Sequence, residues 1–174
     1  MQFRRIGQLV AATTVSAVAL SGAQAVAQEN KTTISVTNIT DIHGHLEDKI
    51  GDPAKAGDEI GVARLQSLIK QVNEGQEFNL TSSGDNVGGS AFVSAISDDK
   101  YTLEALNKMG MKVTAVGNHE FDKGTEDLTG RIADSSDYPI LGANVFKDGK
   151  PLLEASHVEE IDGVKVGYVG TVTE

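Results

Sequence analysis

Three times along the chain, a short apolar or β-branched run ends at a turn that carries carboxylate, imidazole or amide side chains. The runs and the turns that follow them are 32–40 with 41–45, 78–81 with 83–86, and 112–116 with 117–122. Between the runs, residues 65–72 and 102–109 repeat apolar side chains at helical spacing. Alternating strands and helices predict a layered α/β domain, in which ligands sit at the carboxyl ends of the strands.

Glycine and polar residues mark the ends of the predicted elements. Gly75 and Gly110 each follow a helical pattern at a position where glycine commonly ends a helix. Residues 48–57 are polar and include Gly and Pro, which predicts a loop. Asp162-Gly163 is a favoured two-residue hairpin turn. In the second half of the chain we expect a helix at 125–133, a strand at 138–146 and a hairpin at 157–173.

The first 27 residues have the pattern of a secretory signal peptide. Arg4 and Arg5 form a basic start, residues 9–20 are a short apolar stretch, and small residues including Ala25 and Ala27 follow. The apolar stretch is shorter than the roughly 20 residues that a membrane-spanning helix needs. We therefore expect residues 1–27 to be a signal peptide. The mature chain is then secreted or extracytoplasmic (periplasm or cell envelope), with no membrane span after cleavage.

The charge of the chain argues against polyanionic partners. The net charge is −10, and it becomes −12 once Arg4 and Arg5 are removed with the signal peptide. Because no basic stripe is present to release counterions, we expect no nucleic-acid partner and no binding to an anionic membrane surface. An anionic substrate would need local positive charge at its site. The absence of Cys excludes disulfides and thiolate chemistry.

The three turns carry side chains of the kinds that bind divalent metals. Asp41 and His43 are two residues apart, so on an extended segment both side chains point the same way and can share one ion. Asp85 has two carboxylate oxygens and can bridge two ions, and Asn118 adds a neutral oxygen that suits Mn²⁺, Zn²⁺ or Fe. Two ions about 3.5–4 Å apart can activate a water for displacement at phosphorus. The turns together predict a two-metal hydrolase site.

The third turn also carries a predicted catalytic pair. His119 precedes Asp122 by three residues, and a carboxylate beside an imidazole fixes its tautomer and stabilises its protonated form. A cationic His119 could stabilise developing charge or protonate a leaving alkoxide. Taken singly, each turn fits an Asx-turn, a helix cap or a surface pair. Their joint occurrence at strand ends is what favours a catalytic site.

Neighbouring residues receive plainer predictions. We expect His45 and His157 to be polar surface residues, Glu120 to be a carboxylate at a helix start, and Phe121 to lie in the core. The glycines of the second turn region let the backbone come close to ions and phosphate oxygens. They are Gly84, Gly88 and Gly89.

Five blocks of the chain resemble the secreted 5'-nucleotidase/UDP-sugar hydrolase family, which belongs to the calcineurin-like metallophosphoesterases. The blocks are Asp41–His45, Ile60–Leu65, Ser82–Asn86, Gly117–Asp122 and Gly163–Gly170. The similarity covers essentially the whole mature chain, and the Gly-Asn-His-Glu-Phe-Asp block is highly specific. The resemblance implies a layered metallophosphoesterase-type β-sandwich flanked by helices.

The same resemblance implies an activity and a role for six residues. The activity is metal-dependent hydrolysis of nucleoside 5'-monophosphates, often with UDP-sugars as further substrates, so the partner is a nucleotide. The cofactors are two divalent ions of the Mn, Zn or Co type. The implied roles are a first metal on Asp41 and His43, a bridging Asp85, a second metal on Asn118, and a catalytic dyad of His119 and Asp122.

The sequence departs from the family pattern after residue 120. The family completes both metals with later His residues, including a Gly-His-x-His motif, and adds a nucleotide-binding domain. In this chain the only later His is His157. We therefore expect residues 28–174 to be the N-terminal portion of a metallophosphoesterase catalytic domain, truncated before the rest. An inactive metal-binding fragment, a 2',3'-cyclic-nucleotide phosphodiesterase and a thiosulfate-oxidation hydrolase remain alternatives.

Overall fold

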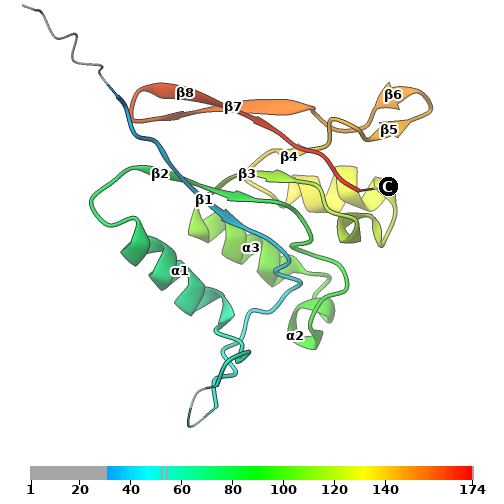
Figure 1. Ribbon diagram of the computed structural model, residues 1–174. Coiled ribbons are helices and arrows are strands. Elements are labelled where there is room, and N and C mark those ends of the chain that lie inside the picture. Colours follow the sequence, from blue (N-terminus) through cyan, green and yellow to red (C-terminus); the bar gives the residue numbers. More distant parts are fainter. Residues whose placement is uncertain (1–30, 52, 54, 174) are drawn as a thin grey trace, which may run out of the picture. The chain divides into compact units, whose positions relative to one another are not determined.

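A four-stranded parallel sheet in the order β1–β2–β3–β4 forms the centre of residues 33–174 (Figure 1). Its strands are Ser35–Ile39, Phe78–Ser82, Met111–Ala115 and Ile140–Leu141. The computed structural model describes residues 31–51, 53 and 55–173, so the predicted signal peptide lies outside the described residues. Because the strands are parallel, their carboxyl ends meet at one edge, and the three predicted turns follow β1, β2 and β3 there.

Helices lie between the strands along the chain, and α1 and α3 cover the same face of the main sheet (Figure 1). The helical elements are α1 Gly61–Val72, α2 Phe92–Ala95, α3 Lys100–Met109, the 3₁₀ turn η1 His119–Phe121, α4 Thr125–Asp127 and the π-helical turn η2 Leu128–Ile132. The predicted stop after α3 is confirmed, since Gly110 adopts a left-handed φ of 81°. Among the described residues, no helix is long and apolar enough to cross a membrane.

Apolar side chains between the sheet and the helices form two buried clusters. The first contains Ile69, Leu80, Leu106, Met111 and Tyr138. The second contains Val87, Leu103, Val116, Leu128, Ile132 and Ile140. Phe121 packs against the second cluster, which confirms its predicted place in the core. Val87 and Val116 of the second cluster directly adjoin two of the predicted turns, so packing of this cluster helps to fix where these turns lie.

The apolar stripe of α1 is wider than the surface that it buries. Ile69 is 7% exposed, whereas Leu68 is 48% and Val72 is 76% exposed. Helical periodicity located this helix correctly but did not show which of its apolar residues face the sheet, because that depends on how the helix rotates against its neighbours.

The strand predicted over residues 138–146 is wrong in length, because only β4 pairs with β3. The chain then turns, with the N–H of Val145 donating to the carbonyl of Gly142. The N–H of Gly142 donates to the carbonyl of Glu154, so this backbone donor turns to a later segment instead of extending the sheet. The residues that follow form a separate short hairpin of β5, Phe146–Lys147, and β6, Lys150–Pro151.

A second hairpin lies over the face of the main sheet opposite α1 and α3 (Figure 1). Its strands are β7, Ser156–Ile161, and β8, Val164–Val169. The predicted Asp162-Gly163 turn is confirmed, with φ of 53° and 78° at its two residues. The side-chain amide of Asn79 on β2 donates to the Tyr168 hydroxyl at 3.2 Å. Helices, main sheet and hairpin therefore form successive layers, and the predicted layered α/β class is confirmed.

We expect Leu106→Ala to lower the free energy of unfolding by about 2–5 kcal/mol, because it opens a cavity in the core. Leu106 is fully buried. Leu68→Ala is the matched control, since the same atoms are removed from a half-exposed position on α1. Denaturant unfolding of the two variants measures the difference. Equal losses would contradict the assignment of the core.

Candidate active site

The turns that follow β1 and β2 lie side by side and are joined by backbone hydrogen bonds. The N–H groups of Asp41 and His43 donate to the carbonyls of Gly84 and Asp85, both at 3.1 Å. Asp41, His43 and Asp85 have positive φ values of 53°, 43° and 54°. Such values are uncommon outside glycine and occur mostly at turns and functional sites. The backbone therefore bends sharply at each of these three predicted metal ligands.

The side chains of Asp41, His43 and Asp85 converge. One potential ligand atom from each lies within 4.8 Å of the other two, and His43 Nε2 is 3.7 Å from Asp41 Oδ1. Two carboxylates and one imidazole on a partly exposed surface make a donor set that suits a divalent cation. The structure therefore brings together three of the four predicted metal ligands.

The hydrogen bond of the His43 ring fixes its tautomer. His43 Nδ1 lies 2.7 Å from the carbonyl oxygen of Gly88. Because a carbonyl oxygen only accepts, the proton of the neutral ring is on Nδ1, and Nε2 keeps its lone pair free. A backbone carbonyl that holds the distal nitrogen is the usual partner of a metal-binding imidazole.

Asn118, the fourth predicted ligand, lies on the turn after β3. It is exposed, and its backbone carbonyl accepts the N–H of Phe121 in the η1 turn. The next residue contacts the metal-ligand group directly, since the N–H of His119 donates to Asp85 Oδ1 at 2.9 Å. The third turn thus adjoins the other two, while the ligand role of Asn118 stays a prediction.

The predicted pair of His119 and Asp122 is formed in the structure. His119 Nδ1 lies 3.1 Å from Asp122 Oδ2, and the N–H of Gly89 donates to the same oxygen at 2.9 Å. The ring of His119 stands edge-on to that of His43, with 4.8 Å between centroids. The pair therefore lies next to the group of Asp41, His43 and Asp85.

The hydrogen bond that His119 donates to Asp122 raises the pKa of His119 above the usual value of an imidazole. Burial opposes this shift, and the charges of Asp122, Asp85 and Glu120 add to it. A raised pKa means that the imidazolium form persists to higher pH than in the unfolded chain. The geometry thus favours the imidazolium form of His119 beside a cluster of carboxylates.

Glu120 has a role that its sequence position did not reveal. Its side chain is buried at 3% exposure, and it accepts the backbone N–H groups of Asp85, Asn86 and Gly117 at 3.0, 2.8 and 2.7 Å. The N–H of Val87 is a fourth, longer contact. Burial raises the pKa of this carboxyl, and the N–H donors oppose the shift. Glu120 does lie in the first turn of η1, as predicted, but it joins the turns after β2 and β3.

Two glycines allow these turns to meet. A Cβ atom on Gly84, which has a φ of 101°, would lie 2.4 Å from the backbone nitrogen of Gly117. A Cβ on Gly117 would lie 2.2 Å from Asp85 Oδ1. Glycine at position 84 therefore allows the turn after β2 to pack directly against the backbone of the turn after β3.

The remaining histidines each face a glutamate side chain. His45 Nδ1 is 2.9 Å from Glu59 Oε2, and His157 Nε2 is 2.7 Å from Glu159 Oε1. Both positions fit the predicted polar surface roles.

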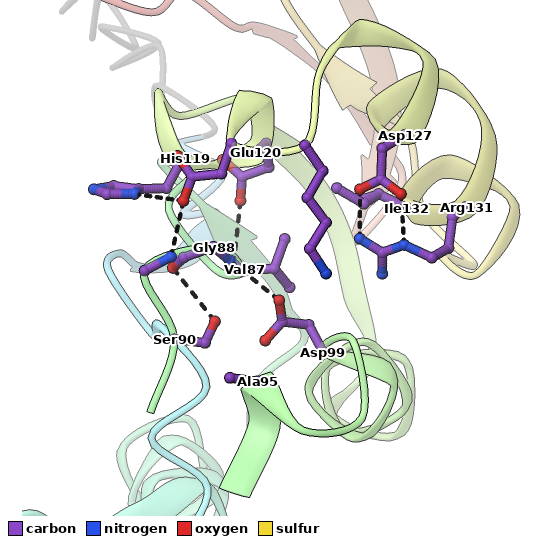
Figure 2. A pocket seen from close by; sticks show the side chains of 13 residues that line it. Val87, Gly88, Ser90, Ala95, Asp99, His119, Glu120, Asp127, Arg131 and Ile132 are labelled. Carbon is purple, nitrogen blue, oxygen red and sulfur yellow. Dashed lines mark hydrogen bonds and ion pairs between the residues drawn. The ribbon is translucent and has the colours of Figure 1, made fainter. Parts of the chain in front are cut away.

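A cavity of about 160 Å³ lies beside the pair of His119 and Asp122 (Figure 2). Figure 2 shows His119 and Glu120 on one side of the cavity, Asp99 on another, and Arg131 paired with Asp127. Lys123, also on the lining, pairs with Asp98 at 2.6 Å. The lysine and the arginine of the lining are thus each paired with an aspartate.

Comparisons with known proteins place the chain in a family, although no family model matches it. The cell wall protein Lmo0130 of Listeria monocytogenes is 33% identical over 95% of this chain and 25% of its own length. The 5'-nucleotidase of Vibrio cholerae is 30% identical over 67% of this chain and 22% of its own length. The structure of the NAD nucleotidase of Haemophilus influenzae matches with a TM-score of 0.65 at 22% identity, over 80% of this chain and 26% of that one.

The chain belongs to the 5'-nucleotidase family. Within this family of metallophosphoesterases it corresponds to the N-terminal part, as the resemblance of its motifs implied. It spans about a quarter of the length of these two curated relatives. The likeness to the solved 5'-nucleotidase-type structures shows that the fold is shared with their N-terminal domains.

We expect Glu120→Gln to lower the free energy of unfolding by at least about 1.5–3 kcal/mol, the value of one hydrogen bond to a charged group. A glutamine side chain has only one acceptor oxygen. Its NH₂ group would therefore face backbone N–H groups that now donate to the second oxygen of Glu120. Hydrogen exchange at the amides of Asp85 and Asn86 should accelerate. Glu104→Gln, at an exposed position on α3, is the control. Unchanged exchange at both amides would show that Glu120 does not hold these turns.

We expect the NMR titration midpoint of His119 in the metal-free chain to lie above 6.5 and to fall toward that value in Asp122→Asn. Because the folded-state pKa is raised, the pair stabilises the fold fully below pH 6.5. That contribution is lost as the pH rises through the raised pKa. Asp134→Asn, an exposed position on a neighbouring helix, should leave the midpoint unchanged. The same midpoint in Asp122→Asn and wild type would rule out Asp122 as the cause.

Proposed function

We propose that this chain carries part of the active site of a phosphoesterase that hydrolyses nucleoside 5'-monophosphates, with UDP-sugars as further substrates. The observation that supports it is the placement of the His119–Asp122 pair next to the convergent group of Asp41, His43 and Asp85. The family supports phosphoester chemistry in general, and a 5'-nucleotidase is among the relatives.

The donor set fits divalent cations, and we assign two ions of the Mn, Zn or Co type. Asp41 and His43 would hold the first ion, Asp85 would bridge, and Asn118 would hold the second. The free Nε2 of His43 supports this assignment. Bound ions would lower the pKa of a water ligand and offset the negative charge of the phosphate.

Charge at the site supports a requirement for cations. Lys123 and Arg131 line the neighbouring cavity, but each is held in an ion pair with an aspartate. The metal-ligand group itself contributes two carboxylates. A phosphate monoester would therefore be repelled unless positive charge is added at this group.

His119 is the group that we assign to proton transfer. Its Nδ1 faces Asp122, so in the imidazolium form the proton on Nε2 is available to another acceptor. We infer that Nε2–H donates this proton to the 5' oxygen as the nucleoside leaves. Asp122 keeps the ring oriented and, with the N–H of Gly89, is itself held in place.

The location that we propose is extracytoplasmic. It rests on the signal-peptide pattern of residues 1–27 and on the similarity to a cell wall protein. We assign residues 28–174 to the N-terminal portion of the catalytic domain and propose a nucleotide, not a nucleic acid, as the partner.

The test is phosphate release from 5'-AMP with Mn²⁺ or Zn²⁺ and with an EDTA control, on this chain and on any longer product that the gene encodes. We expect chelator-sensitive release that Asp85→Asn lowers at least about 100-fold, because charge at the metals is worth several kcal/mol. We expect His119→Ala to lower kcat by about 10²–10⁴-fold, the usual contribution of a general acid, with metal content unchanged.

Three results would point elsewhere. Metal uptake without turnover in every form would favour the alternative of an inactive metal-binding fragment. Preference for 2',3'-cyclic AMP, assayed in parallel, would favour a cyclic-nucleotide phosphodiesterase. Loss of metal from His119→Ala would make His119 a ligand in place of an acid. The exposed Asp134→Asn change serves as the control and should retain wild-type turnover.

A further inference from the structure

The loop of Gly88 and Gly89 contacts both halves of the candidate site. The carbonyl of Gly88 accepts the N–H of His43 Nδ1 at 2.7 Å, and the N–H of Gly89 donates to Asp122 at 2.9 Å. The loop also packs closely on His119, since a Cβ atom on Gly88 would lie 2.2 Å from the His119 carbonyl oxygen. Any shift of this loop would therefore move the partners of His43 and Asp122 together.

A buried carboxylate holds the loop from the other side. Asp99 Oδ2 accepts the N–H of Gly88 at 3.3 Å, and Asp99 is only 4% exposed. Its other oxygen accepts the hydroxyl of Ser94 at 2.7 Å, and Ser94 Oγ lies 2.6 Å from the hydroxyl of Thr102. Ser94 and Thr102 are fully buried. A continuous set of hydrogen bonds thus connects α3 with the Gly88 peptide (Figure 2 shows Asp99 beneath Gly88).

Asp99 lies at a helix N-terminus but does not cap the helix with its side chain. It is the N-cap residue of α3, and the side chain of such a residue usually accepts an N–H of its own helix. Here the side chain makes no capping bond and faces Gly88 and Ser94 instead. The carboxylate of Asp99 thus binds the Gly88 loop and Ser94 in place of the first turn of α3.

The backbone that directs Asp99 is an unusual one. Asp98 and Asp99 both have positive φ, 51° and 60°, which side-chain-bearing residues keep only where their surroundings enforce it. Arg131 donates from Nη1 to the carbonyl of Asp98, and its Nε and Nη2 are held by Asp127. The turn is therefore fixed to the segment that follows the His119–Asp122 pair.

We propose that Asp99 is a positioning residue of this site. Its carboxylate fixes the Gly88 peptide, and the loop in turn holds His43 in the Nδ1-protonated tautomer through the Gly88 carbonyl and Asp122 through the Gly89 N–H. Asp99 acts by accepting hydrogen bonds from the Gly88 N–H and the Ser94 hydroxyl, and its role is to position the loop. The effect on the tautomer requires no metal, whereas its consequence for metal affinity rests on the proposed function.

The test compares Asp99→Gly with Asp98→Gly and Asp99→Asn. Glycine accepts a positive φ without strain, so Asp99→Gly removes the carboxylate alone. Asp98→Gly makes the same change at the next residue, loses only an exposed ion pair with Lys123, and keeps the carbonyl that Arg131 contacts. Asparagine also tolerates this backbone and keeps an oxygen for the Gly88 N–H, so Asp99→Asn should rescue the site.

The first readout is the ¹⁵N shifts of the His43 ring in the metal-free chain. We expect wild type, Asp98→Gly and Asp99→Asn to show the Nδ1–H tautomer, and Asp99→Gly to show a mixture of both tautomers. The ring of His45, which pairs with Glu59, should be the same in all four proteins. The second readout is Zn²⁺ titration, where Asp99→Gly should weaken binding by about 10–100-fold, as other outer-sphere partners of metal-binding histidines do.

The proposal would be overturned if a folded Asp99→Gly protein kept the wild-type His43 shifts and Zn²⁺ affinity. A lower Tm alone would show that Asp99 only stabilises the fold. A mixture of tautomers in Asp98→Gly as well would also overturn it, because the effect would then come from the turn and not from the carboxylate. If wild type binds no Zn²⁺, the metal assignment fails and the tautomer readout still decides. If Asp99→Gly does not fold, Ser94→Ala, which removes one of the bonds to Asp99, is judged by the same two readouts.

Discussion

The backbone N–H groups at the ends of parallel strands need acceptors, and in this chain the buried carboxylate of Glu120 supplies them. Its two oxygens take donors from the turn after β2 and the turn after β3. A buried charge is costly unless it is fully hydrogen-bonded, and these N–H groups meet that requirement. Asp85, His119 and Asp122 all lie within a few residues of the groups that Glu120 holds. The position of Asp85 relative to the proposed dyad therefore depends on this side chain.

The loops of the site are held in place by hydrogen bonds to two buried carboxylates. Glu120 holds the turns after β2 and β3, and Asp99 contacts the glycine loop between β2 and α2. The loops at the surface carry the exposed and partly exposed ligands, while the side chains of Glu120 and Asp99 that orient them are buried. Such an arrangement places exposed reactive groups on rigid supports, which is what precise metal and proton-transfer geometry requires.

Local patterns in the sequence predicted the elements whose causes are local. The hairpin of β7 and β8 followed from an Asp-Gly turn, and the His119–Asp122 contact followed from a spacing of three residues. The end of α3 followed from Gly110. The predicted length of β4 was wrong because the N–H groups of Gly142 and Ala143 donate to the carbonyls of Glu154 and Gly170, and no local pattern reports these distant acceptors. The N–H contacts of Glu120 and Asp99 were not predicted for the same reason, since an acid in a sequence does not show whether buried N–H groups will surround it.

The topology of the sheet has a consequence for the order in which the molecule folds. The contact that joins Asp85 to Glu120 closes a separation of 35 residues, and the one between Asn38 and Ser83 closes 45, whereas the β7–β8 hairpin pairs residues that are close in sequence. Chain-closure entropy delays distant pairings relative to local ones. The hairpin and the helices can therefore form early, and the edge that carries the candidate ligands is completed late. A folding intermediate of this chain would contain much of its secondary structure and no assembled site.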